Sequence, residues 1–337
     1  MTSLPTLIKD KIHAQGHMRV SEFMSLTLSH PQHGYYIKQD PLGSKGDFTT
    51  APEISQLFGE MIGIYLYQAY QFAPFSNLIE FGPGKGTLMN DILRTLKKIA
   101  PKIYENITCT LIETSPSLTK KQQALLTLHP QINWQTAFDL SALNEDYFVL
   151  GNEFFDALPV QQYEKIENEW KERVITLDQN NNFLWAQIEC DSEIIPSLYK
   201  ENNFYEHNPY SEEVVQEIAK RQARALFVDY GYTTEFGLKD TLQALKNHQY
   251  KNIFDSLGDQ DLTTHVNFLR LHDLCESYGR KTLVTTQSYF LQQMGITERT
   301  RQLMLKNPAK AANLEKDLDR LIGDDKMGEL FKVLIIE

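Results

Sequence analysis

Residues 78–86 read Leu-Ile-Glu-Phe-Gly-Pro-Gly-Lys-Gly, and this stretch decides the fold. A short apolar run leads into three alternate glycines, Gly82, Gly84 and Gly86, and a helical pattern begins directly after them. A strand that passes through a glycine turn into a helix brings backbone N–H groups and the amino end of the helix close to a polar ligand. We therefore predict an α/β fold with a ligand site at this turn. A tight turn that binds nothing is the alternative.

The motif differs from the common phosphate-binding loops. Lys85 is followed by Gly86 where a P-loop has Ser or Thr, and Thr87 stands where G-x-G-x-x-G requires glycine. Glu80 lies inside the motif and Glu113 at the end of the next predicted strand, and a carboxylate accepts hydrogen bonds from ribose hydroxyls. The pattern favours a neutral or cationic nucleoside over a nucleoside triphosphate or NAD. Glu113 taken alone could also be a solvated strand end.

Predicted strands and helices alternate on both sides of the motif, which indicates a parallel sheet with helices on its faces. The predicted strands cover residues 77–81, 109–113, 131–134, 147–152, 224–231 and 281–287. Two strand-like runs around residues 178–182 predict a hairpin added to this sheet, and the last forty residues predict helix.

The pattern divides the chain into five parts. We expect a helical N-terminal module with a lid loop over 1–75, the ligand-binding core over 76–160, a hairpin and helical insertion over 161–223, the rest of the core with substrate-side loops over 224–295, and a C-terminal helical segment over 296–337. Residues 31–53 form a long loop rich in Gly and Pro, and long ordered loops are often functional. We expect this loop to fold over the ligand as a lid, with Asp47, Thr50 and Glu53 as its polar candidates. A loop that only packs domains together is the alternative.

The composition and the N-terminal residues indicate which partners the protein binds and in which compartment it lies. The 337 residues carry a net charge of -11, which opposes binding to nucleic acid and to anionic membranes. The three cysteines lie far apart with no C-x-x-C pair, so we expect neither a metal site nor a disulfide framework. The first residues resemble no signal or transit peptide, and no apolar run approaches the ~20 residues that span a bilayer. We therefore expect a cytoplasmic protein without membrane insertion.

Seven blocks of the sequence resemble one family, the MidA-like methyltransferases, which include the mitochondrial complex I assembly factor described as a protein arginine methyltransferase. The blocks are His-Gly-Tyr-Tyr at 33–36, Gly-Asp-Phe-Thr-Thr-Ala-Pro-Glu-Ile-Ser at 46–55, Glu-Phe-Gly-Pro-Gly-Lys-Gly-Thr-Leu at 80–88, Asn-Glu-Phe-Phe-Asp-Ala-Leu-Pro at 152–159, Val-Asp-Tyr-Gly-Tyr at 228–232, Asp-Leu-Thr-Thr-His at 261–265 and Thr-Thr-Gln at 285–287. Two positions depart mildly from the family: Gly151, where Ala is more usual, and Asn208, where Ser is usual.

The resemblance implies a class I methyltransferase fold, a Rossmann-like sheet with a helical N-terminal module and an α/β insertion. It also implies S-adenosylmethionine as the cofactor. The contacts expected for that cofactor are Glu80, Gly82, Gly84, Gly86, Thr87, Glu113, Asp47 and Thr50.

The catalytic candidates follow the predicted strand at 147–150. Ligands of open α/β sheets lie at the carboxyl ends of the strands, so Asn152, Glu153 and Asp156 are expected to border the methyl group. A guanidinium acceptor needs carboxylates that grip its fork, and Glu153 is our first choice. The second carboxylate is Asp156, Asp229 or Asp261, each of which could instead be a helix cap or a solvated loop acid. His265 is a further candidate, with a structural hydrogen-bond donor as the alternative.

The motif at residues 208–210 is not assigned to the active site. Asn208-Pro-Tyr210 is similar to a signature of amino-methylating enzymes, but it precedes a polar helix inside the insertion. We interpret it as a helix N-cap and turn.

The leading hypothesis is a methyltransferase that acts on an arginine of a protein partner, with respiratory complex I assembly implied by the resemblance. The alternatives are methylation of a small molecule or of another side chain, which requires a closed pocket, and a non-enzymatic assembly factor that keeps the cofactor fold. The identity of the acceptor, mono- versus dimethylation and the oligomeric state stay open at this point.

Overall fold

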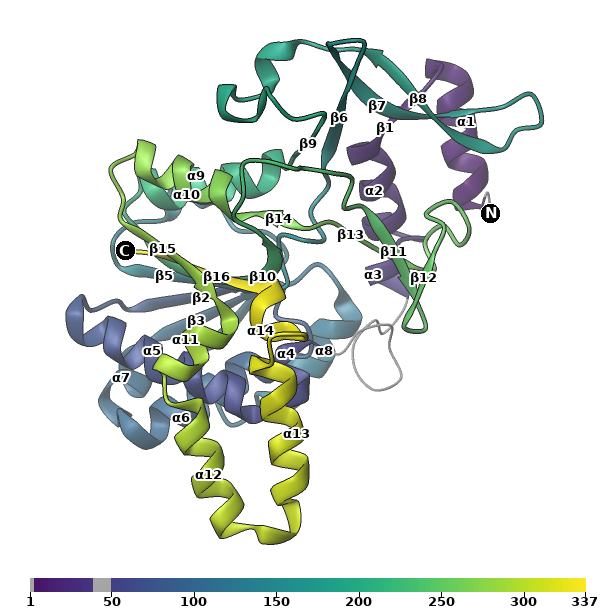
Figure 1. The fold of residues 1–337 in the computed structure, drawn as a ribbon. Helices are drawn as coiled ribbons and strands as arrows, with labels where there is room; N and C mark the ends of the chain where they lie inside the picture. The colour runs from purple at the N-terminus through teal and green to yellow at the C-terminus, as the bar shows by residue number, and fades with distance from the viewer. Residues whose placement is uncertain (1–2, 39–49) are drawn as a thin grey trace.

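The core of the protein is one mixed sheet whose strands run mostly parallel. The computed structural model describes residues 3–38 and 50–337, and there the strand order is β15-β16-β10-β5-β2-β3-β4 (Figure 1). These strands are β2 Asn77–Phe81, β3 Thr108–Ile112, β4 Ile132–Gln135, β5 Tyr147–Asn152, β10 Arg224–Tyr232, β15 Thr282–Thr286 and β16 Phe331–Ile336, with the short β14 Val266–Asn267 beside β10. All pairs from β10 to β4 are parallel, and β16 is antiparallel to both of its neighbours.

The chain order reverses between β2 and β5. From β2 the chain moves outward through β3 to β4, and β5 then returns to the other side of β2. At such a reversal the connections after the two strands diverge, and a crevice opens at their carboxyl ends. The topology therefore places the site at the ends of β2 and β5.

Helices cover both faces of the sheet, so the central strands are apolar on both sides. One face is covered by α5 Gln56–Phe72, α6 Thr87–Ile99, α7 Pro101–Asn106, α11 Gln287–Gln293, α12 Ile296–Lys306 and α13 Ala311–Ile322, and the other by α9 Pro209–Lys220 and α10 Phe268–Ser277. Gly151 of β5 reflects this packing: a Cβ there would lie 2.7 Å from the ring of Phe227. Asn208 accepts a hydrogen bond from the backbone N–H of Ser211 at 3.0 Å, which confirms the expected N-cap of α9.

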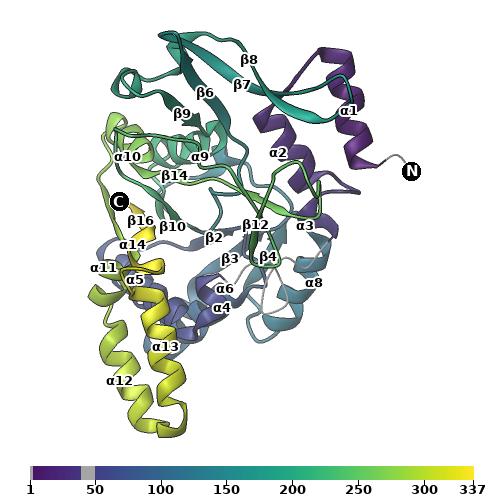
Figure 2. The same cartoon turned by 45° about the vertical axis from the view of Figure 1, so that its right-hand side comes forward.

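A second lobe, which we call the cap lobe, consists of α1 to α3, β1, β6 to β9 and β11 to β13. Its bounds are α1 Leu4–Gln15, β1 Met18–Arg19, α2 Val20–Ser29, α3 Tyr35–Lys38, β6 Gln161–Ile166, β7 Glu169–Leu177, β8 Phe183–Glu189, β9 Phe204–His207, β11 Gln243–Lys246, β12 Gln249–Lys251 and β13 Asp261–Thr263. Buried residues of α1 and α2 pack with Val160, Ile175 and Leu262 in one apolar cluster. Segments from the N-terminal end and the middle of the chain thus form one body above the central sheet (Figures 1 and 2).

Two expectations from the sequence are wrong here. The hairpin of β7 and β8 does not join the central sheet; it belongs to a separate five-stranded sheet with β1, β6 and β9. The C-terminal segment is not helical to its end, because β16 completes the core between β10 and β15. A hairpin pattern specifies only local pairing, and a six-residue apolar run does not distinguish a buried strand from a helix.

The remaining elements surround the crevice and the base of the core. The four-residue helix α4, Ala51–Ile54, and the helix α8, Pro116–Leu125, lie near the site, and α14, Met327–Leu330, precedes β16. Helices α12 and α13 form a hairpin that projects from the core (Figure 2). Within the described residues, no helix combines the length and the apolar character needed to cross a membrane.

Candidate active site

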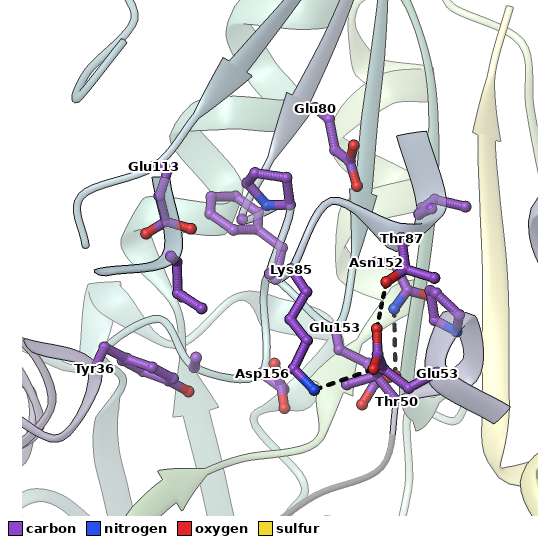
Figure 3. A pocket seen from close by; sticks show the side chains of 18 of the residues that line it. Tyr36, Thr50, Glu53, Glu80, Lys85, Thr87, Glu113, Asn152, Glu153 and Asp156 are labelled. Atoms are coloured by element: carbon purple, nitrogen blue, oxygen red, sulfur yellow. Dashed lines mark hydrogen bonds and ion pairs between the residues drawn. The ribbon is translucent and has the colours of Figure 1, made fainter. Parts of the chain in front are cut away.

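A cavity of about 320 Å³ lies between the carboxyl ends of the core strands and the cap lobe. Its wall includes the glycine loop after β2, the residues after β3 and β5, α4 and Tyr36 of the cap lobe. Figure 3 shows Glu80 and Glu113 on one side of this space and Tyr36 and Asp156 on the other. The cavity therefore has two halves, one beside the glycine loop and one beside the cap lobe.

The glycine loop forms the first half. Gly82, Gly84 and Gly86 have φ values of 60°, 55° and 84°, in the region that favours glycine. Gly82 and Gly84 line the cavity, so the backbone can approach a ligand there. Gly86 does not line it: a Cβ at Gly86 would lie 3.2 Å from Leu126 and 3.3 Å from the side chain of Gln122. Gly86 therefore permits helix packing and caps α6.

Glu80 is a buried acid that faces this half of the cavity. Only 2% of the residue is exposed, and its Oε2 has no hydrogen-bond partner within residues 3–38 and 50–337. Burial, and then the charge of Glu113, raise the pKa of Glu80 to about 8. A buried acceptor without a partner is costly, so the site has unused capacity for a donor or cation of a ligand.

Glu113 is held in place by groups near the loop. Its Oε1 accepts the backbone N–H of Ser115 at 2.7 Å, and its Oε2 accepts Gln122 Nε2 at 3.1 Å. Burial raises the pKa of Glu113, and these hydrogen bonds oppose that rise. The same Gln122 nitrogen donates to the carbonyl oxygen of Gly84 at 2.7 Å.

Gln122 was not among the expected residues. It is fully buried on α8 and also accepts Trp134 Nε1 at 3.1 Å, so it joins the glycine loop to the acid after β3. The sequence held one sign of this role: Gln122 is a polar residue four positions after the buried Leu118, so it lies on the inward face of the helix.

Glu153 lies at the end of β5 with a constrained backbone. Its φ is 50°, which is uncommon for a residue with a side chain, and its N–H donates to the carbonyl of Val228 at 2.8 Å. Its Oε1 accepts the N–H of Ala51 at 3.2 Å and Asn152 Nδ2 at 3.3 Å. Burial, and then the charge of Asp156, raise the pKa of Glu153 to about 7. Two donors thus orient a carboxylate that titrates near neutral pH.

Asp156 and Asp261 form the half of the cavity beside the cap lobe. Asp156 is 5% exposed, and its Oδ1 lacks a hydrogen-bond partner in the described part of the chain. Asp261 accepts a hydrogen bond from the hydroxyl of Tyr36 at 3.0 Å. Tyr36 belongs to the His-Gly-Tyr-Tyr block, but nothing in the sequence assigned it to the site.

The helix α4 links the two halves. Glu53 accepts hydrogen bonds from Lys85 Nζ at 3.2 Å and from the Thr87 hydroxyl, and Thr50 lines the cavity just before the helix (Figure 3). Thr87 lines the cavity, but its hydroxyl donates to Glu53 and is not free for a ligand to accept.

Two of the catalytic candidates do not line the cavity. Asp229 accepts the backbone N–H groups of Phe154, Phe155 and Asp156 at 2.9 to 3.2 Å, and its other oxygen accepts that of Tyr230. Burial and the charges of Asp156 and Glu153 raise the pKa of Asp229, and these N–H donors oppose that rise. Its geometry is that of a group that shapes the turn after β5.

His265 lies behind the wall, with its ring edge-on to that of Tyr230 at 5.4 Å between centroids. Burial lowers its pKa. It borders a separate small pocket. Asp47 lies outside the described residues. Within the part that the structure describes, no group of three or more His, Cys, Asp or Glu side chains could hold a metal ion.

The first half of the cavity fits the implied cofactor. The open Oε2 of Glu80 suits a cationic or hydrogen-bond-donating group, and the backbone at Gly82 and Gly84 allows close approach. Glu113 offers carboxylate oxygens to ribose hydroxyls. A nucleoside that carries a cationic side chain satisfies all three features.

Comparisons with known proteins also indicate a protein that binds S-adenosylmethionine. Residues 61–286 match the family model described as "Putative S-adenosyl-L-methionine-dependent methyltransferase". The protein arginine methyltransferase NDUFAF7, mitochondrial, of Danio rerio is 33% identical over 96% of this chain and 84% of its own length, and that of Homo sapiens is 31% identical over 95% and 80%. A crystal structure from Burkholderia thailandensis with bound S-adenosyl-homocysteine has the same fold, with a TM-score of 0.87, 24% identity, and 99% and 91% of the two chains covered.

The names of these relatives correct one expectation. They describe mitochondrial proteins, so the expected cytoplasmic location is wrong. That expectation rested on the composition of the N-terminal residues, which does not determine the compartment. The family model and the relatives together show that this chain belongs to the family of S-adenosyl-L-methionine-dependent methyltransferases.

Proposed function

We propose that this enzyme methylates an arginine side chain of a protein partner. The observation that carries the proposal is that three carboxylates, Glu153, Asp156 and Asp261, line the cavity. A guanidinium is permanently charged and binds carboxylates through its planar fork. The relatives named protein arginine methyltransferase support the same acceptor.

The residues divide into donor and acceptor groups. Glu80, Gly82, Gly84 and Glu113 would hold S-adenosylmethionine, which supplies an electrophilic methyl group when bound. Asn152 and the N–H of Ala51 orient Glu153 through a single oxygen, Oε1. Its other oxygen is then directed by the same contacts and can accept a hydrogen bond from the guanidinium.

Glu153 can also receive the proton that methyl transfer releases. The S–CH₃ bond breaks, an N–CH₃ bond forms, and the substituted guanidinium then loses one proton to remain singly charged. A carboxylate with a pKa near 7 accepts and returns a proton readily at neutral pH. Asp229 contributes indirectly, because it holds the backbone from which Glu153 and Asp156 project.

The partner is proposed to be a protein handled during respiratory complex I assembly, as the family resemblance implies. Absence of nucleic acid as a partner stays a prediction from the net charge of -11.

The test is transfer of labelled methyl to protein arginine. The purified enzyme is incubated with labelled S-adenosylmethionine and a protein extract, and methylarginine is measured by mass spectrometry. Glu153→Gln keeps the shape of the side chain but removes its charge, so we expect methyl transfer to fall by at least ~100-fold while cofactor affinity stays within a few fold. Glu145→Gln, an exposed glutamate just before β5, is the matched control and should leave both unchanged. Label on another residue type, or near-normal transfer by Glu153→Gln, would contradict the proposal.

A further inference from the structure

Tyr36 connects two distant segments of the cap lobe at the cavity. It comes from α3 of the cap lobe, and its hydroxyl donates to Asp261 Oδ1 at 3.0 Å across 225 positions of sequence. Both residues line the cavity, as does Asp156 of the core. Figure 3 shows the ring of Tyr36 extending into the cavity on the side of Asp156.

Asp156 supplies independent evidence for a ligand at this position. It is 5% exposed, and its Oδ1 has no hydrogen-bond partner among the described residues. A buried carboxylate oxygen without a donor is rare in native structures and is costly unless a ligand satisfies it. Burial raises the pKa of Asp156 to about 6, and the nearby Tyr230 hydroxyl opposes that rise. Neither Asp156 Oδ1 nor that hydroxyl makes a hydrogen bond within the described residues, so a donor can reach Oδ1 from the cavity that Asp156, Asp261 and Tyr36 share.

The phenol is suited to hold a carboxylate. Burial, and then the charges of Asp261 and Asp156, raise the pKa of Tyr36 well above its usual value, so the hydroxyl stays a donor over the physiological range. The cap lobe has its own apolar core, which includes Leu262 next to Asp261 and Tyr35 next to Tyr36. Because that core already holds α3 to β13, the hydrogen bond is not needed to join them.

We infer that Tyr36 is a positioning residue that holds Asp261 opposite Asp156, so that the cap lobe and the core together bind the cationic side chain of the acceptor. This inference rests on the proposed function. It deepens that function because it assigns selection of the acceptor to the cap lobe and binding of the donor to the core. Tyr36→Phe keeps the ring and loses only the hydroxyl that donates to Asp261.

The experiment measures binding of a small acceptor probe to the full chain saturated with S-adenosyl-homocysteine. The probe is N-acetyl-arginine methylamide, with the neutral N-acetyl-citrulline methylamide for comparison, and both are titrated by ligand-observed NMR. We expect the wild-type protein to bind the arginine probe at least ~10-fold more tightly than the citrulline probe, because carboxylates bind the charged fork.

Tyr36→Phe should weaken binding of the arginine probe about tenfold, the effect of one lost hydrogen bond to a charged group, and leave affinity for S-adenosyl-homocysteine within twofold. Asp261→Asn should weaken probe binding at least as much. Because Tyr36 acts through Asp261, adding Tyr36→Phe to Asp261→Asn should cause no further loss. A residue that only stabilised the fold would not show this non-additivity.

Tyr163→Phe is the matched control. Tyr163 is a fully buried tyrosine of β6 in the same lobe, and its hydroxyl donates to Gln161 at 3.2 Å. This variant should keep wild-type binding of the probe. Wild-type binding by Tyr36→Phe, or independent effects of the two single variants, would overturn the inference alone. Failure of the wild-type protein to distinguish arginine from citrulline would instead overturn the proposed function, and the inference with it.

Discussion

Replacement of Glu80 by glutamine should remove a pH dependence from cofactor binding. In the free protein, burial and the nearby Glu113 raise the pKa of Glu80 to about 8. The ionised fraction is then about 1% at pH 6, 9% at pH 7 and 50% at pH 8. The methyl donor is cationic and binds beside this carboxyl group, so binding favours its ionised form. We expect the affinity of the wild-type protein to rise by roughly 50-fold between pH 6 and pH 8, in step with that fraction.

The assay is isothermal titration of S-adenosylmethionine at pH 6, 7 and 8, in buffers with different ionisation enthalpies. At pH 7 the wild-type protein should release about 0.9 proton from Glu80 on binding, because about nine tenths of that group is protonated beforehand. Glu80→Gln should lose this component and bind with an affinity that varies far less with pH. Glu153→Gln is the control, since Glu153 lies in the acceptor half and its loss should preserve the slope. An equal slope in wild type and Glu80→Gln would refute the assignment of Glu80 to the donor.

Three further outcomes follow from the same half of the cavity. The pKa of Glu80 lies above that of an unfolded glutamate, so the folded state keeps a proton that the unfolded state has lost, and wild-type stability falls as pH rises from about 4.5 to 8. The decline in the free energy of unfolding is about 1.4 kcal/mol per pH unit at most. Glu80→Gln should remove this contribution, as measured by urea unfolding of the ligand-free protein. Gly84→Val should abolish cofactor binding, because a branched side chain is strained at a φ of 55° and fills the approach to the backbone, and unchanged affinity in calorimetry would exclude that loop as the binding site. Gln122→Leu should weaken cofactor binding about tenfold, since it removes the donor to the Gly84 carbonyl and to Oε2 of Glu113. A folded variant with wild-type affinity would show that this link is dispensable.

Features that depend on residues close together in the chain could be predicted from the sequence. The strand, glycine turn and helix around residues 78–99 depend on near neighbours in the chain, and so does the cap of α9 at Asn208. Parallel strands buried on both faces are nearly continuous apolar runs, which is why most of the central strands could be located. Because ligands bind at the carboxyl ends of such strands, the residues after β2, β3 and β5 could be named as candidates before their geometry was known.

Tertiary structure decided which of those candidates meet. Asp156, Asp229 and Asp261 are equivalent in sequence, but Asp229 faces four backbone N–H groups, Asp261 faces Tyr36, and Asp156 has an oxygen open to the cavity. The union of the N-terminal helices with the middle insertion, and the place of β16 within the core sheet, depend on pairings between distant segments. Sequence periodicity records which face of an element is buried and not which element buries it, so the cap lobe and its half of the cavity could be recognised only in the folded chain.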